Sequence, residues 1–176
     1  FKQMTVDMET EWSQFHREGA PDLYPEALRD EIEAVSKPIY TEVNNGVYRC
    51  GFAGRQAAYD AAYDRLFSAL DRLEARLLNQ RYLVGDTITE ADVRLFTTLA
   101  RFDAVYHGHF KCNRSKLSEM PALWGYARDL FQTPGFGDTN WSDVISILRQ
   151  GGFKGCIDIE GWHDPVYRGD LEMTGQ

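Results

Sequence analysis

Two tyrosines lie in short segments that combine glycine and polar residues with aromatic ones. Tyr48 follows Asn44-Asn45-Gly46 in VNNGVYRCGFA, and Tyr106 lies in FDAVYHGHFKCN. A phenol with its ordinary pKa near ~10 can deliver a proton to a leaving oxygen, or can hydrogen-bond a thiolate and so lower a thiol's pKa. The commoner role of a tyrosine is a packed ring with a hydrogen-bonded hydroxyl, and either residue fits that role too.

The histidines and cysteines carry weaker signals. His107 and His109 form an HxH pair, but no third or fourth ligand stands at a recognisable spacing, so the pattern favours ordinary histidines over a metal site. The three cysteines, Cys50, Cys112 and Cys156, show no CxxC spacing, which predicts free thiols rather than a disulfide framework or a zinc site. We expect all three thiols to be structural and inert.

Composition narrows the class of protein. The hydrophobic content of 43% and the aromatic content of 13% predict a packed globule. The net charge of −8, without any run of Lys or Arg, argues against a nucleic-acid partner. No segment approaches the ~20 apolar residues of a membrane span, and none has the pattern of a signal peptide, so we expect no membrane partner and a cytoplasmic location.

Helical periodicity runs through most of the chain. Apolar residues at helical spacing predict a short helix within residues 4–18 and longer helices over 25–40, 55–78, 89–108 and 120–131. Pro38 is expected to kink or tighten the end of the first long helix. Asn44-Asn45-Gly46 reads as a turn or helix end, followed by an irregular connection over 47–52. These elements predict an all-α bundle.

The strongest local signal is the start of the helix at Thr89. Thr89 and Asp92 have the spacing of a capping box, and Ile88 and Val93 have that of a hydrophobic staple. The carboxylate of Asp92 is expected to be buried, because the capping amides can satisfy it. After residue 137 the pattern changes to a helix over 141–150 and an alternating, strand-like run over 151–160, so the bundle is expected to carry a short helix–strand tail.

The same motifs resemble a known family. RYLVGDTITEADVRLFTTLARFD is similar to the core helix start of the glutathione S-transferase C-terminal domain, whose capping Thr and buried Asp fall on Thr89 and Asp92. DLYPEALRDEIEAV, VNNGVYRCGFA and RYLVGDTITEADVRLFTTLARFDAVYHGHFKCN resemble the glutathionyl-hydroquinone reductases, the xi class of glutathione transferases, over about residues 10–137. The two tyrosine motifs are the most specific part of this likeness.

The resemblance implies an activity and a set of roles. Members of this family use glutathione as co-substrate to remove the glutathionyl group from glutathionyl-hydroquinones, and their nucleophilic Cys lies in a thioredoxin-like domain. By that likeness Tyr48 serves as proton donor and acceptor, Tyr106 helps to lower the pKa of the catalytic thiol, and no metal takes part. The helical domain would supply the pocket for the aromatic substrate, and a homodimer is a further expectation.

Two features of the sequence differ from the pattern of this family and bear on the expected activity. No Cys-Pro pair occurs in the 176 residues, so the chain is expected to be incomplete and inactive alone. Residues 141–176 resemble the end of a xylose-isomerase-like sugar isomerase barrel, where Glu160 would match a metal-binding glutamate. We therefore expect a lead segment remaining from an interdomain region (1–24), a transferase-like helical domain (25–137) and an extraneous tail (138–176). The alternative functions are a non-catalytic helical interaction module and, third, a fragment of a metal-dependent sugar isomerase.

Overall fold

A computed structural model describes residues 6–7 and 9–137 of the chain. By its contacts the chain divides into two compact units, Phe1–Asp138 and Thr139–Gln176, and the described residues all belong to the first. Within the described ranges the secondary structure is helical and contains no strand, which confirms the all-α class. The predicted helix–strand tail lies outside these residues. None of the described helices has the length and apolar character needed to cross a membrane.

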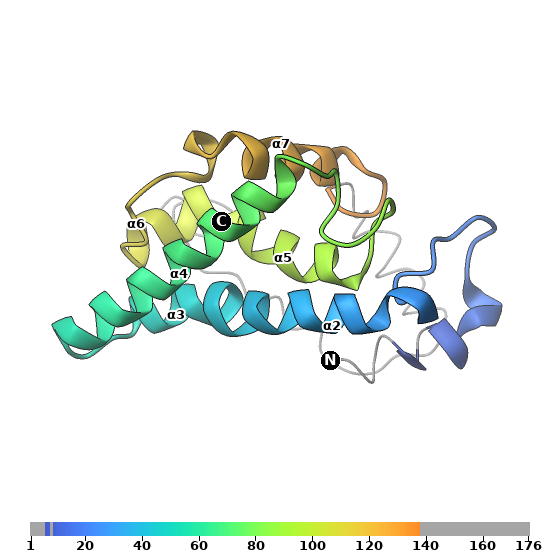
Figure 1. Cartoon of the computed structure of the whole chain (residues 1–176), viewed down its shortest axis with the longest axis horizontal. Coiled ribbons are helices and arrows are strands. Elements are labelled where there is room, and N and C mark those ends of the chain that lie inside the picture. Colours follow the sequence, from blue (N-terminus) through green and yellow to red (C-terminus); the bar gives the residue numbers. More distant parts are fainter. Residues whose placement is uncertain (1–5, 8, 138–176) are drawn as a thin grey trace, which may run out of the picture. The chain divides into compact units, whose positions relative to one another are not determined.

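Helices follow one another at short spacing, as Figure 1 shows. In chain order the described elements are η1 (Ser13–Phe15), η2 (Glu26–Leu28), α2 (Arg29–Pro38), the π-helical turn η3 (Ile39–Asn44), α3 (Asn45–Gly51), α4 (Gln56–Leu77), α5 (Glu90–Arg101), the π-helical turn η4 (Phe102–Tyr106), α6 (His107–His109), η5 (Leu117–Glu119) and α7 (Pro121–Gln132). The long helices predicted over 55–78 and 120–131 are confirmed to within a residue or two, and Pro121 occupies the first turn of α7.

The prediction of a helix end at Asn44-Asn45-Gly46 is wrong, because α2, η3 and α3 form one continuous helical path. Pro38 has no amide hydrogen to donate to a preceding carbonyl, and the chain continues from it into a π-helical turn instead of stopping. Tertiary contacts then hold the polar residues in the helix. The Asn44 side-chain amide donates to the Arg94 carbonyl oxygen at 2.8 Å, and Gly46 is buried where a Cβ would meet Leu66 at 3.5 Å.

Helix α4 lies at the centre of the packing, against α3 along one part of its length and α7 along another. Helix α5 packs against both α2 and α7, which closes the bundle around a shared core (Figure 1). The apolar stripe predicted for α4 is buried from Leu66 through Leu70 and Leu73 to Leu77. The largest fully buried side chains belong to several helices and the loop before α5: Phe67, Phe102, Ile32, Ile39, Leu66, Leu70, Leu83, Leu95, Leu99, Leu123 and Leu130.

The start of α5 is anchored by a buried carboxylate. The capping box between Thr89 and Asp92 is formed, and Asp92 is fully buried, as predicted. Asp92 accepts four hydrogen bonds: from the Thr89 amide at 2.8 Å, the Thr89 hydroxyl at 3.0 Å, the Leu83 amide at 2.9 Å and the Tyr126 hydroxyl at 2.7 Å. One carboxylate therefore joins the preceding loop, the helix start and α7, which makes its burial tolerable.

Candidate functional site

The two tyrosines singled out from the sequence meet in the fold. Tyr48 lies on α3 and Tyr106 ends η4, and their hydroxyl oxygens are 3.1 Å apart, within hydrogen-bonding distance. Their ring centroids are 5.7 Å apart with the planes at 67°, an edge-to-face contact. Both residues lie on helical backbone. The prediction of an irregular connection around Tyr48 is wrong, because α3 continues through this segment.

An aromatic cluster surrounds this pair. The ring of Phe110 lies 5.4 Å from both tyrosine rings and 5.3 Å from that of Phe52, measured between centroids. Tyr106 is 2% exposed, whereas Tyr48 is 39% and Phe52 is 68% exposed. The cluster therefore has a buried side, with Tyr106, and an open side, where Tyr48 and Phe52 offer aromatic surface to a ligand.

The buried environment of Tyr106 makes its phenol less acidic than an ordinary tyrosine. Burial, followed by the hydrogen bond with Tyr48, raises the pKa of Tyr106 well above that of an ordinary tyrosine. Tyr106 therefore stays protonated at all physiological pH values and can donate its hydrogen to the Tyr48 oxygen. In that arrangement the Tyr48 proton is left to point away from Tyr106, towards the open side of the cluster.

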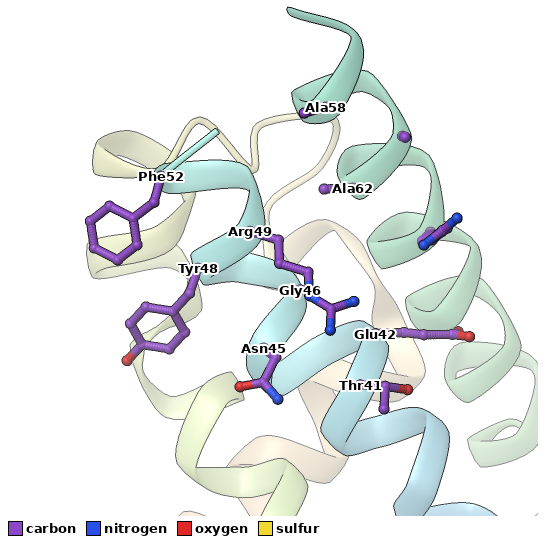
Figure 2. A pocket seen from close by; sticks show the side chains of 11 residues that line it. Thr41, Glu42, Asn45, Gly46, Tyr48, Arg49, Phe52, Ala58 and Ala62 are labelled. Carbon is purple, nitrogen blue, oxygen red and sulfur yellow. The ribbon is translucent and has the colours of Figure 1, made fainter. Parts of the chain in front are cut away.

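A cavity of about 600 Å³ lies between α3 and α4, beside Tyr48. Figure 2 shows Arg49 and Asn45 extending from α3, with Ala58 and Ala62 on the facing side of α4. The alanines leave space because their side chains are short. In the same view the ring of Tyr48 projects to the side of α3, with its hydroxyl directed away from the helix. The cavity thus combines apolar walls with a guanidinium group, and Tyr48 borders it with its hydroxyl turned away.

Cationic groups from both helices reach this cavity. Arg49 of α3 and Arg65 of α4 line it, and neither is engaged in an ion pair with any described residue. Glu42, which also lines it, is paired with Arg72. Two unneutralised guanidinium groups make the cavity suited to a ligand that carries carboxylates. Sequence reasoning missed both arginines, although the four-residue spacing of Asn45 and Arg49 on a helix places them on one face.

The remaining candidates fall in different places. His107 and His109 lie on α6, and within the described part of the chain no group of three or more His, Cys, Asp or Glu side chains is arranged to hold a metal. Cys50 and Cys112 are free and buried, as predicted. The Cys112 thiol donates to the Phe110 carbonyl oxygen at 3.9 Å. Cys156 and Glu160 lie outside the described residues.

Comparison with known proteins places this architecture in a class. Residues 56–129 match the family model described as glutathione S-transferase, C-terminal domain. Residues 56–129, which include α4, α5 and most of α7, therefore resemble the glutathione S-transferase C-terminal domain.

Its relatives narrow the class further. The chain is 50% identical over 150 residues to the glutathionyl-hydroquinone reductase YqjG of Escherichia coli, an alignment covering 82% of this chain and 46% of YqjG. It is 53% identical over 102 residues to the glutathionyl-hydroquinone reductase PcpF of Sphingobium chlorophenolicum, covering 58% of this chain and 33% of PcpF. The predicted resemblance to the glutathionyl-hydroquinone reductases is confirmed.

Solved structures of glutathione transferases are similar to this chain in both sequence and fold. A glutathione transferase from Gordonia bronchialis is 67% identical, with a TM-score of 0.77, over 97% of this chain and 56% of the other. The glutathione-bound structure of YqjG is 41% identical, with a TM-score of 0.71, over 88% of this chain and 52% of the other. The chain thus spans about half the length of YqjG and a third of PcpF. None of these matches is a sugar isomerase, so they lend no support to the second resemblance, drawn for residues 141–176.

Proposed function

We propose that this chain supplies the substrate pocket of a glutathione-dependent oxidoreductase that reduces glutathionyl-hydroquinones to hydroquinones. The observation that carries the proposal is the contact between the hydroxyls of Tyr48 and Tyr106, 3.1 Å apart, with Tyr48 on a helix that also lines a 600 Å³ cavity. The likeness to the glutathionyl-hydroquinone reductase YqjG, which covers 82% of this chain, includes the helices that bear both tyrosines. The open faces of Tyr48 and Phe52 would stack against the hydroquinone ring.

The reaction would need a thiolate from a thioredoxin-like domain, because no Cys-Pro pair occurs in these 176 residues. That thiolate would attack the glutathionyl sulfur, the carbon–sulfur bond to the ring would break, and the leaving hydroquinone would take up a proton. A second glutathione thiol would then free the cysteine and leave as glutathione disulfide. In this scheme the glutathionyl group bears carboxylates, for which Arg49 and Arg65 provide the complementary charge.

Tyr48 would be the proton donor and acceptor, since it is the exposed member of the pair. Tyr106 would support Tyr48 from the buried side of the aromatic cluster. Burial keeps the Tyr106 hydroxyl protonated, so this hydroxyl can donate a hydrogen bond to the Tyr48 oxygen. Hydrogen bonds in a chain strengthen one another, so Tyr48 would be a better donor to the catalytic thiolate and would lower that thiol's pKa. Tyr106 would in this way influence the thiol through Tyr48.

The test joins a thioredoxin-like domain from a glutathionyl-hydroquinone reductase to the amino end of this chain. Release of hydroquinone from a glutathionyl-hydroquinone, with formation of glutathione disulfide, is expected from the fusion and not from the chain alone. A fusion that binds glutathione normally yet releases no hydroquinone would favour the alternative, a non-catalytic helical interaction module. Turnover by the chain alone would contradict the assignment of the nucleophile.

A further inference from the structure

Another cavity, of about 400 Å³, lies where the connection between α3 and α4 meets the segment that follows α6. It shares no lining residue with the cavity beside Tyr48. Gly51, Ala53 and Gly54 line it, and their small or absent side chains leave the space open. The function proposed above makes no use of this cavity.

Two cationic side chains line this cavity. They are Arg55 and Lys111, and none of the described lining residues is acidic. Neither Arg55 nor Lys111 is engaged in an ion pair with any described residue. Asp60, one turn further along α4, accepts a hydrogen bond from the Gln56 side-chain amide at 2.7 Å. In a chain of net charge −8, such a cationic cavity favours a ligand that carries negative charge.

The rest of the lining adds hydrogen-bond donors to this charge. Asn113 contributes a side-chain amide from the segment after α6. The 22-residue helix α4 begins at the cavity, with Arg55 as its N-cap, no side-chain cap and no acidic residue in its first turn. The positive end of the helix dipole therefore reinforces the two cationic side chains.

The walls of the cavity are held in place by hydrogen bonds and close packing. The Tyr59 hydroxyl donates to the Lys111 carbonyl oxygen at 2.6 Å, and the Lys111 amide donates to the Gly108 carbonyl oxygen at 3.3 Å. Gly51 lies so near the ring of Phe110 that a Cβ would meet its Cγ at 2.4 Å. The cavity is therefore formed before a ligand binds, which lowers the entropic cost of binding.

We propose that this cavity binds a small organic anion that carries two negative charges, one for each of Arg55 and Lys111. Its volume of about 400 Å³ lies within the range of about 300–1,000 Å³ that is usual for small-molecule sites. A dicarboxylate and a phosphate monoester share this chemistry, because guanidinium and ammonium groups pair with the oxygens of both.

Isothermal titration calorimetry on the full chain tests the proposal, with succinate as the dicarboxylate and phenyl phosphate as the monoester. At least one of the two is expected to bind, whereas succinamide, the uncharged analogue of succinate, is not. Arg55→Gln combined with Lys111→Asn is expected to weaken binding about tenfold or more, the scale of losing hydrogen bonds to charged groups. Asn suits position 111 because its φ of 57° lies in the left-handed region. Circular dichroism checks that the variant is folded.

A matched control removes the same two charges elsewhere. Arg17→Gln combined with Lys37→Gln changes exposed residues outside the cavity and is expected to keep the parent affinity. Equal weakening in the two double variants would mean that the net charge alone attracts the anion, and would overturn the proposal. Loss of binding in Arg49→Gln combined with Arg65→Gln instead would assign the anion to the cavity beside Tyr48, with the same consequence.

The choice of probe tests the class of ligand. Absence of binding by both succinate and phenyl phosphate overturns the site. Inorganic phosphate that binds as tightly as phenyl phosphate would overturn the requirement for an organic anion.

Nuclear magnetic resonance on the same chain locates the bound anion. The backbone amide signals of Gly54 and Asn113 are expected to shift and to saturate, and that of Gly125, on α7, is expected to stay unchanged. Shifts confined to other parts of the chain would contradict the proposed location. These measurements need no thioredoxin-like domain, so they stand whether or not the reductase activity exists.

Discussion

The hydroxyl oxygens of Tyr48 and Tyr106 lie 3.1 Å apart, although α3 and η4 are separated by the whole of α4 and α5 in the chain. The contact is asymmetric, because Tyr106 is 2% exposed and Tyr48 is 39% exposed. A buried phenol that holds its proton therefore lies within hydrogen-bonding distance of an exposed one, and the roles proposed for the two tyrosines follow from this difference in burial.

The first prediction concerns these roles. In the fusion with a thioredoxin-like domain, Tyr48→Phe is expected to lower kcat/KM for a glutathionyl-hydroquinone by about 10²–10⁴-fold, the usual contribution of proton transfer. Tyr106→Phe removes only the supporting hydrogen bond, and the expected loss is about fivefold, equivalent to about 1 kcal/mol. Steady-state kinetics on both variants provide the comparison.

Tyr40→Phe is the matched control, since Tyr40 is 57% exposed and lies one π-turn before α3. It is expected to keep the parent rate. If the double variant without Tyr48 and Tyr106 hydroxyls also kept that rate, the two phenols would be packing residues and the proposed mechanism would be wrong.

The second prediction concerns the buried carboxylate. Asp92→Ala leaves the Leu83 and Thr89 amides and the Tyr126 hydroxyl without their acceptor, so the free energy of unfolding is expected to fall by about 3–4 kcal/mol. Urea unfolding followed by circular dichroism measures it. Asp86→Ala, an exposed residue in the turn before the cap, is expected to change stability by less than about 0.5 kcal/mol. Similar losses in the two variants would show that Asp92 is no anchor.

The third prediction concerns the close approach of α3 to Phe110. Gly51→Ala introduces a Cβ that would meet the Phe110 ring at 2.4 Å, and the expected destabilisation is about 1–3 kcal/mol. Gly54→Ala, whose Cβ would meet nothing within 4 Å, serves as the control. Phe110→Leu should relieve part of the clash, so the double variant should lose less than the sum of the single losses. Strict additivity would argue against the packing described.

The fourth prediction concerns alkaline pH. Burial raises the pKa of Tyr106, and burial together with the Asp92 charge raises that of Tyr126, both above the ordinary value of about 10. The unfolded chain therefore loses these protons first, and stability present below pH ~10 falls as the pH rises further, by up to about 1.4 kcal/mol per pH unit for each phenol. Urea unfolding between about pH 8 and 11 tests this expectation.

Single substitutions separate the two phenols. Tyr126→Phe and Tyr106→Phe are each expected to flatten the alkaline slope, whereas Tyr40→Phe should leave it unchanged because Tyr40 is exposed. A slope that keeps its full size in the Tyr106, Tyr126 double variant would assign the alkaline loss of stability to other groups.

The sequence predicts the parts of this fold that depend on local patterns. Thr89 and Asp92 predict the start of α5, because a capping box is made by residues three apart. Helix α4 is predicted by apolar residues that repeat at helical spacing. The path through Asn44-Asn45-Gly46 was missed because its cause is not local. Asn44 is held by the Arg94 carbonyl and Gly46 by its packing against Leu66, and both partners come much later in the chain.

The candidate site also has features that the sequence predicts and features that depend on contacts between distant residues. Tyr48 and Tyr106 could be named from their surrounding residues, yet no spacing rule indicates that their hydroxyls meet. Arg49 could have been found from its place on one helical face with Asn45, had the segment been recognised as helical.

The two π-helical turns, η3 and η4, each hold one more residue than a regular α-helical turn would. The extra residue is taken up within the wider turn, so Tyr48, which follows η3, points where residue 47 would point if the helix were regular throughout, a difference of about 100°. A regular α-helical turn of the same number of residues at 39–44 would therefore turn Tyr48 away from Tyr106, whereas a turn one residue shorter would keep its direction. Among relatives, a chain one residue shorter at 39–44 should therefore keep the tyrosine pair, and a regular helix of unchanged length there should lose it.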